Sequence, residues 1–249
     1  RSNIIVDGNG YTVQGTGAYE SKGIYLSGIS NVIIKNMEVK AFRYGIILHS
    51  SSSNIISGNN ITANNGYGIV LESASKFNII SGNTVSNNGC GIVLESKFNI
   101  INENTIANNG HGIWLSDSSK FNIISGNTFF NDGLIFLRSY GNVIVDNLVN
   151  DKPLVYLEGV SDYAVENAGQ VILVNCYNIL VENLDLSHTD VGVQLWGTSN
   201  NSISGNNIAN NWCGIWLDDS SNYNSISGNA IANNWCGIWL DDSSNYNSI

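Results

Sequence analysis

Two pairs of acidic residues recur 23 positions apart in the same context, WLDDSSNY: Asp218 with Asp219, and Asp241 with Asp242. Carboxylate oxygens are the ligands that Ca²⁺ prefers, and a cation would relieve the repulsion between like charges on neighbouring strands, about 4.8 Å apart. We therefore predict a calcium site at these four residues, the only cofactor that the sequence suggests. The alternative is a solvated acidic surface that needs no ion.

Four cysteines are the next candidates for chemistry. Cys213 and Cys236 occupy the same place in consecutive 23-residue repeats, so their Cα atoms should lie within the ~4.4–6.8 Å range of disulfides. The alternative is a pair of inward thiols that act as small hydrophobic side chains. Cys90 holds the same place in an earlier repeat and Cys176 lies elsewhere, so both are disulfide candidates without an obvious partner in the chain. The absence of a CxxC motif argues against zinc or redox chemistry.

Tryptophans form a third candidate site. Five of them recur around the motif GIWL or at the corner before it: Trp114, Trp212, Trp216, Trp235 and Trp239. We predict that they form an exposed aromatic face, which is typical of either a protein interface or a platform on which sugars stack. The interface is favoured because identical repeats present identical surfaces.

No catalytic residue can be assigned. A hydrolase of this composition would need carboxylates converging on one groove, and the acids of the irregular region cannot be shown to do so. Copper ligation is poorly supported, because there is one Met and the histidines occupy different repeat positions: His49, His111 and His188. Whether the chain is an enzyme stays open, with a non-catalytic role favoured.

An internal repeat organises all of these residues. Residues 201–223 and 224–246 differ only at Asn207 against Ala230, which gives a period of 23. Related hexapeptides of the type NIISGN begin at earlier asparagines: Asn31, Asn54, Asn78, Asn99, Asn122, Asn142 and Asn178. A fixed period of this length is typical of a solenoid, in which each repeat buries its apolar face against its neighbours.

The spacing within a repeat predicts short strands separated by corners. Two residues after the leading Asn stands an apolar residue that we expect to face inward: Ile33, Ile56, Ile80, Ile101, Ile124, Ile144, Leu180, Ile203 and Ile226. A Gly-Asn kink, a second apolar position and a Gly-Ile-x-Leu strand follow. No leucine-rich consensus or helix-length pattern is present. We predict an all-β fold, a right-handed parallel β-helix of about ten coils.

The 41 asparagines have a structural role in this fold. We expect two ladders of side-chain amides, one at each of two corners: Asn54, Asn78, Asn99 and Asn122, and Asn59, Asn83, Asn104 and Asn127. Such ladders also satisfy backbone groups that no strand pairs. One domain, 1–249, is predicted, with an irregular insertion in 142–178.

Charge and hydropathy exclude several partners. The net charge is −10, and all ten Lys and Arg lie at or before Lys152, so nucleic acid is not expected. No apolar run is long enough for a membrane span.

The recurring NxISGNxI…GIxL pattern resembles the parallel β-helix repeats of the NosD-like and carbohydrate-binding or sugar-hydrolase groups, and the repeat arrays of archaeal cell-surface proteins. The resemblance covers nearly the whole chain, and its repeated residues are those that build the coil. It implies an exported protein, in the cell envelope or acting on polysaccharide, with copper-site maturation as the NosD variant.

Regular coils with near-identical final repeats lead us to expect an extracellular structural protein of the cell surface, a rigid element of an envelope, sheath or filament. Its partners would be copies of itself or other envelope proteins. The alternative is a polysaccharide-binding protein or a carbohydrate-active lyase or hydrolase. Function depends on surface features here, because the repeats themselves specify only the coil.

Overall fold

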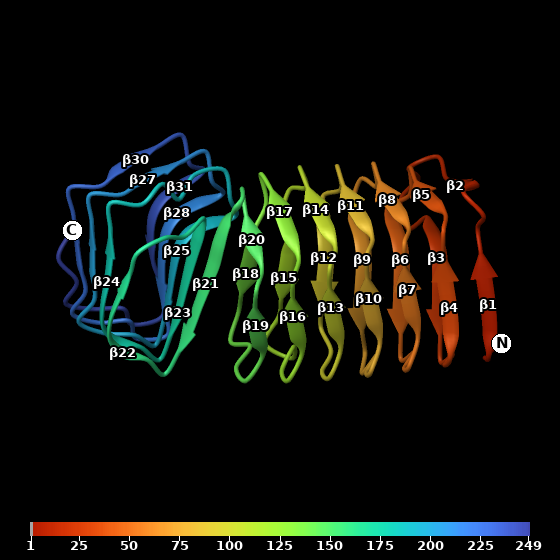
Figure 1. Ribbon diagram of the computed structural model, residues 1–249, viewed down its shortest axis with the longest axis horizontal. Coiled ribbons are helices and arrows are strands. Elements are labelled where there is room, and N and C mark those ends of the chain that lie inside the picture. The colour runs from red at the N-terminus through yellow and green to blue at the C-terminus, as the bar shows by residue number, and fades with distance from the viewer. Residues whose placement is uncertain (1) are drawn as a thin grey trace. The chain divides into compact units, whose positions relative to one another are not determined.

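The computed structural model describes residues 2–249 as 31 strands. Within that range it contains no helix, and hence none able to cross a lipid bilayer. The chain divides into two compact units, Arg1–Asn147 (unit 1) and Leu148–Ile249 (unit 2). In each unit parallel strands from successive coils stack side by side, which confirms the predicted parallel β-helix (Figure 1).

Unit 1 has three parallel sheets, and each coil contributes one strand to each sheet. The first sheet contains β1 (Ile4–Asp7), β4 (Val32–Lys35), β7 (Ile55–Ser57), β10 (Ile79–Ser81), β13 (Ile100–Asn102), β16 (Ile123–Ser125) and β19 (Val143–Val145). The second contains β2 (Thr12–Gln14), β5 (Glu38–Lys40), β8 (Asn60–Thr62), β11 (Thr84–Ser86), β14 (Thr105–Ala107) and β17 (Thr128–Phe130). The third contains β3 (Lys22–Ser27), β6 (Tyr44–His49), β9 (Tyr67–Glu72), β12 (Cys90–Leu94), β15 (Ile113–Leu115) and β18 (Leu134–Phe136).

Unit 2 is also built of coils whose strands pair in parallel. One set of parallel strands contains β21 (Lys152–Glu158), β23 (Gln170–Val174), β25 (Val191–Trp196), β28 (Cys213–Asp218) and β31 (Cys236–Leu240). A second contains β22 (Ser161–Val165), β24 (Tyr177–Glu182), β26 (Ser202–Ser204) and β29 (Ser225–Ser227), and a third contains β27 (Asn207–Ala209) and β30 (Ala230–Ala232). The short β20 (Leu148–Val149) pairs antiparallel with β21, so the stretch predicted to be irregular, 142–178, contains this reversal of direction.

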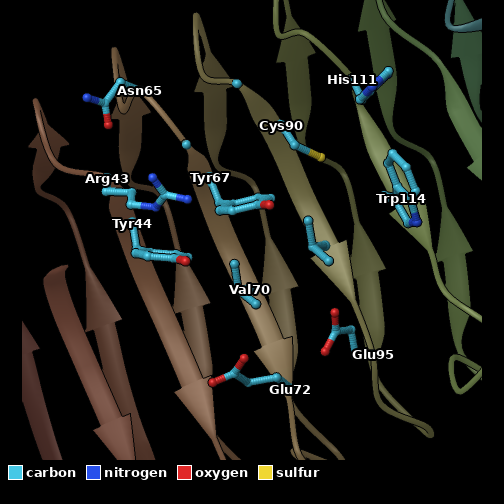
Figure 2. Close-up of a pocket in the computed structure, with 13 residues that line it drawn as sticks. Arg43, Tyr44, Asn65, Tyr67, Val70, Glu72, Cys90, Glu95, His111 and Trp114 are labelled. Carbon is cyan, nitrogen blue, oxygen red and sulfur yellow. The ribbon is translucent and has the colours of Figure 1, made fainter. Parts of the chain in front are cut away.

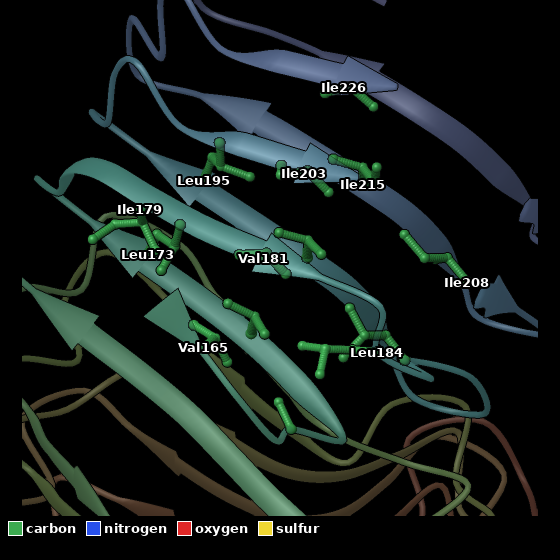
Figure 3. Packing of buried hydrophobic residues seen from close by; sticks show 14 of the residues in the cluster. Val165, Leu173, Ile179, Val181, Leu184, Leu195, Ile203, Ile208, Ile215 and Ile226 are labelled. Atoms are coloured by element: carbon green, nitrogen blue, oxygen red, sulfur yellow. The ribbon is translucent and has the colours of Figure 1, made fainter. Parts of the chain in front are cut away.

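The interior of each unit is a stack of branched aliphatic side chains. In unit 1, Ile56, Ile80, Ile101 and Ile124 are completely buried and in register on successive strands. Figure 3 shows the equivalent stack in unit 2, with Ile203, Ile215 and their neighbours pointing into the coil. Each such side chain stabilises the fold by about 1.5–3 kcal/mol relative to an exposed one.

Two of the residues predicted to face inward do not, because the reading frame shifts by one residue in their coils. Ile34, not Ile33, pairs with the buried Ile56. Leu180 is 41% exposed, whereas its neighbours Ile179 and Val181 are buried. In these two coils an apolar residue stands where other coils have an asparagine. The backbone N–H of Val32 donates to the side-chain oxygen of Asn54, and that of Ile179 donates to the side-chain oxygen of Asn201.

Both predicted asparagine ladders are present in unit 1, and they extend to Asn142 and Asn147. A third ladder, which the sequence reasoning missed, runs along the next corner through Asn64, Asn88 and Asn109 and ends on Asp132. The sequence feature that indicates this third ladder is the Asn-Asn-Gly tripeptide that recurs at the corner. The three ladders fix all three corners of the coil, and therefore the positions of the strands between them.

Candidate functional site

A groove of about 600 Å³ lies on the outer face of the third sheet of unit 1, across β6, β9, β12 and β15. Aromatic side chains, two carboxylates and one guanidinium line it (Figure 2). This combination offers apolar surfaces beside hydrogen-bonding groups, as small-molecule and carbohydrate sites do.

The Gly-Ile-x-Leu motif explains why large side chains point outward here. A Cβ on Gly68 would lie 2.5 Å from the carbonyl oxygen of Gly91 and 2.9 Å from Cγ1 of Val85, so this inward position accepts only glycine. Tyr67 pairs with Cys90, and the next pair in register is Ile69 with Ile92. The residue before the glycine and the residue between Ile and Leu therefore both face outward.

The floor of the groove is apolar although it lies on the outside of the coil. Ile47, Val70 and Val93 are in register on successive strands and are only 3 to 8% exposed. Tyr44, Tyr67 and Trp114 pack against them and against the buried Cys90. Burial on the outer face thus depends on the surrounding aromatic rings.

Aromatic rings form both walls of the groove. The rings of Tyr44 and Tyr67 stack with centroids 5.3 Å apart, and the Arg43 guanidinium lies 5.6 Å from the Tyr44 centroid. On the far side Trp114 contacts the His111 ring edge-on at 5.3 Å. Ring faces flanked by a cation and an imidazole suit an amphipathic ligand.

Two glutamates lie together at the other end of the groove (Figure 2). Oε1 of Glu72 lies 3.0 Å from Nδ1 of His49. Partial burial, and then the charge of Glu72, raise the pKa of the Glu95 carboxyl. The pair therefore offers one carboxylate with a fixed partner and one carboxyl that takes up a proton more readily.

The predicted aromatic face is divided between the two units. Four tryptophans assemble in unit 2: Trp212 stacks on Trp235 at 5.6 Å, and Trp216 stacks on Trp239 at 5.2 Å. Trp216 is only 6% exposed, and its Nε1 has no hydrogen-bond partner in the part of the chain that the structure describes. The stacked rings cover part of one another's faces, whereas Trp235 is 74% exposed. Trp114 belongs to the unit 1 groove.

The acidic pairs do not assemble into a metal site. Within residues 2–249, no three His, Cys, Asp or Glu side chains are grouped to hold an ion. Asp218 and Asp241 each accept a hydrogen bond from the next backbone N–H, and Asp218 is 5% exposed whereas Asp241 and Asp242 are exposed. The calcium prediction at Asp218, Asp219, Asp241 and Asp242 therefore gains no geometric support.

Copper fits the side chains no better. Copper prefers imidazole, thioether and thiolate ligands gathered at one point. Nδ1 of His49 is paired with Glu72, and Met37 is 5% exposed in unit 1. His188 lies in unit 2, in the corner after Leu186.

No disulfide joins any of the four cysteines in the structure. Cys213 and Cys236 are partners in register, as their spacing predicted, without a disulfide between them. Burial, and then the neighbouring thiol of Cys236, raise the pKa of Cys213. Burial also raises the pKa of Cys176. Cys90, which holds the repeat position of Cys213, belongs to the floor of the outer groove.

Two acids of the irregular region are held by local partners. Glu158 accepts a hydrogen bond from the Tyr156 hydroxyl at 2.7 Å, and Asp162 accepts one from Asn178 at 2.7 Å. Sequence reasoning instead missed the groove residues Tyr44 and Tyr67, whose signal was their position one place before the glycine of Gly-Ile-x-Leu.

Comparisons with solved structures agree with the fold. DFA-IIIase from Arthrobacter chlorophenolicus A6, as a mutant in complex with DFA-III, is 13% identical over 92% of this chain and 64% of its own, with a TM-score of 0.52. The same enzyme without its lid gives 12% identity, coverage of 92% and 62%, and a TM-score of 0.51. The Dettilon tailspike protein is 20% identical over 88% of this chain and 43% of its own, with a TM-score of 0.45. The chain thus spans 43 to 64% of the length of these proteins.

A search of curated proteins found no match. The family model described as "Periplasmic copper-binding protein (NosD)" matches twice in succession, over residues 1–133 and 130–249. The two matches together cover the whole sequence. This chain therefore belongs to the NosD family of parallel β-helix proteins.

Proposed function

We propose that this chain is an exported protein that binds an extended carbohydrate in the groove of unit 1. The observation that carries the proposal is the groove itself, in which Tyr67 and Trp114 stand on opposite sides of an apolar floor with Glu72 and Glu95 at one end. A pyranose ring presents C–H groups to aromatic faces and hydroxyl groups to carboxylates, so it matches both kinds of surface.

The charges of the groove favour a neutral or amino sugar. Glu72 and Glu95 would repel the carboxylate of a uronic acid, and Glu95 is already affected by the charge of Glu72. Unit 2 is also acidic, because every Lys and Arg of the chain lies at or before Lys152. We therefore expect weak or no binding of uronic-acid polymers at low ionic strength.

The family supports the proposed location. Its model is described as periplasmic, and an exported chain meets envelope and extracellular polysaccharides. Placement outside the cell, at its surface, is the finer part of the proposal. DFA-IIIase was crystallised with DFA-III, but its 13% identity supports only the shared fold.

Binding of the whole chain to immobilised neutral, amino and uronic polysaccharides tests the function, followed by titration calorimetry. We expect Tyr67→Ala and Trp114→Ala each to weaken binding of the selected glycan at least tenfold. Trp235→Ala, an exposed indole of unit 2, is the matched control and should bind as the wild type does. The assignment of the groove as the glycan site would be overturned if Trp235→Ala lost as much affinity as the groove variants. It would also be overturned if both groove variants bound the glycan as the wild type does.

The same samples separate binding from hydrolysis. New reducing ends that appear with wild-type protein and disappear in Glu95→Gln would identify a hydrolase, because glycoside hydrolysis uses a pair of carboxyl groups, one of them an acid whose pKa is raised. Binding without new reducing ends identifies a carbohydrate-binding protein.

A second candidate function is a structural element of the envelope, sheath or filament. The observation that favours it is an exposed ladder of Phe77, Phe98 and Phe121, whose rings stack 5.6 and 5.5 Å apart and are 41 to 61% exposed. Such an apolar strip suits contacts with copies of the chain or with other envelope proteins. Electron microscopy with and without reductant and calcium chelator tests for ordered assemblies, and isolated particles under all conditions would contradict this role.

A further inference from the structure

The outer-face position before the glycine of Gly-Ile-x-Leu changes character along unit 1. Tyr44, Tyr67 and Cys90 hold this position on β6, β9 and β12 and are partners in register. His111 holds it on the next coil, since it precedes Ile113 by two residues as Cys90 precedes Ile92, and those isoleucines are paired. The series is therefore aromatic, aromatic, thiol, imidazole.

Cys90 interrupts a ladder of rings. Tyr44 and Tyr67 stack at 5.3 Å, which leaves one face of Tyr67 turned toward the coil of Cys90. The coils of Tyr67 and His111 are two strand spacings apart, about 9.6 Å. One six-membered ring fits between them at contact distances of about 3.5–4.0 Å on each side.

The corner beside Cys90 keeps this recess open. Gly89 stands there, and a Cβ on it would lie 2.5 Å from the carbonyl oxygen of Gly66, so a side chain is excluded. Gly110 is the corresponding residue of the next coil, with its own Cβ position 2.3 Å from the Gly89 carbonyl oxygen. Gly66, Gly89 and Gly110, at the same corner of three successive coils, thus leave the mouth of the recess without side chains.

Unit 2 shows what fills the same place when the corner is not glycine. There Trp212 stands at the position of Gly89, and Cys213 and Trp216 stand at the positions of Cys90 and Val93. The indoles of Trp212 and Trp216 contact each other edge-on at 5.7 Å. The coil face therefore accommodates ring systems supplied by the protein in unit 2, and unit 1 leaves the equivalent space for a ligand.

We infer that one pyranose ring of the bound carbohydrate inserts over Cys90 and Val93, between the ring of Tyr67 and the side chains of His111 and Trp114, an inference that rests on the proposed function. A sandwiched ring needs C–H groups on both faces, which an all-equatorial, gluco-configured ring provides. An axial hydroxyl, as in galactose or mannose, would meet an aromatic face. Glu95, on the same coil as Cys90, accepts hydrogen bonds from equatorial hydroxyls at the ring edge.

Filling the recess tests the inference. In the whole chain, Cys90→Phe should continue the tyrosine ladder and weaken binding of cellotriose and laminaritriose at least tenfold, with the thermal midpoint retained. Cys90→Ala leaves the recess open and should weaken binding by less than Cys90→Phe does. Thr84→Phe adds a ring on the exposed second sheet of the same coil and should leave binding unchanged.

A change in tryptophan fluorescence on adding cellotriose, lost in Trp114→Phe, would place the sugar beside that indole. The inference is overturned if Cys90→Phe binds as wild type does while Tyr67→Ala and Trp114→Ala do not, or if galacto-configured trisaccharides bind more tightly than gluco-configured ones. Failure of the wild type to bind any carbohydrate would instead overturn the proposed function. Competition by a tyrosine-containing peptide that excludes the sugar would assign the recess to a protein partner and also overturn the inference.

Discussion

The side-chain oxygen of Asn104 accepts two hydrogen bonds from Asn83, one from the backbone N–H and one from the amide Nδ2, both at 3.0 Å. Asn104 in turn donates from its own Nδ2 to the oxygen of Asn127 at 2.9 Å and to the carbonyl of Ile80 at 2.9 Å. Both residues are about 1% exposed. The ladder therefore satisfies buried backbone groups as well as side-chain amides, and each rung depends on the next.

Replacing one rung should destabilise unit 1 strongly. Asn104→Ala leaves the backbone N–H of Asn83 and the carbonyl of Ile80 without this partner, and each unsatisfied buried group costs about 1–3 kcal/mol. We expect a loss of roughly 3–5 kcal/mol in the free energy of unfolding. Urea denaturation followed by circular dichroism measures it.

Asn60→Ala is the matched control for this ladder variant. Asn60 is exposed on β8, and its single side-chain hydrogen bond, to Glu38, is long at 3.5 Å. The control should change the free energy of unfolding by less than about 0.5 kcal/mol. Equal destabilisation by the two variants would show that the ladder contributes no more than an ordinary surface amide.

Sequence reasoning located the ladders because their spacing is a direct consequence of the coil. It failed at Ile33 and Leu180 because one additional residue entered the coil before the strand, and a period alone cannot show such a shift. Register is set by which face is buried, so a slip of one residue exchanges inward and outward side chains.

The groove was harder to predict than the fold. Tyr67 and Val70 are three residues apart, and strict strand alternation would place them on opposite faces. Both face outward because Gly68 and Ile69 turn inward together. The recess over Cys90 further requires comparing one coil with its neighbours, because the informative feature is a small residue between aromatic ones.

The raised pKa of Glu95 predicts a pH-dependent cost in stability. The folded state holds the proton more tightly than the unfolded state, whose carboxyl titrates near the ordinary value of 4.5. The free energy of unfolding therefore falls as the pH rises above 4.5 toward the higher folded-state pKa, and the deficit stays constant above that. Glu95→Gln removes the ionisation, so it should be more stable than wild type at pH 7.

Because Glu95 is exposed and screened by solvent, we expect this gain to stay below about 0.5 kcal/mol. Thermal melts of both proteins at pH 4, 5.5 and 7 measure the difference. Glu158→Gln, an exposed glutamate of unit 2, is the control. A wild-type protein that gains stability over Glu95→Gln as the pH rises would reverse the sign and contradict the assigned environment of the carboxyl.

The phenylalanine ladder combines stacking with backbone strain. Phe98 adopts a φ of 61°, in the left-handed region, and stacks between Phe77 and Phe121. Removing the ring loses both stacking contacts, but only glycine also relieves the backbone strain. We expect Phe98→Ala to be less stable than Phe98→Gly by about 1 kcal/mol, opposite to the usual order within strands. Paired urea denaturations decide it, and an alanine variant of equal or greater stability would show that the backbone is unstrained.

The thiols of Cys213 and Cys236 should resist oxidation to a disulfide although they are neighbours in register. The thiolate is the reactive form, and burial keeps Cys213 protonated by raising its pKa. Parallel neighbouring strands also hold the Cβ atoms about 4.8 Å apart, beyond the ~3.5–4.5 Å range of disulfides. Mass spectrometry after incubation with oxidised glutathione at pH 7.5 should therefore recover both thiols.

Cys236→Ser removes the smaller cause of the pKa shift and should speed alkylation of Cys213 by less than about tenfold, because burial persists. A peptide cross-linked between the two positions would show that the strands move apart or rotate enough to form the bond, and that this coil is less rigid than its hydrogen bonds indicate.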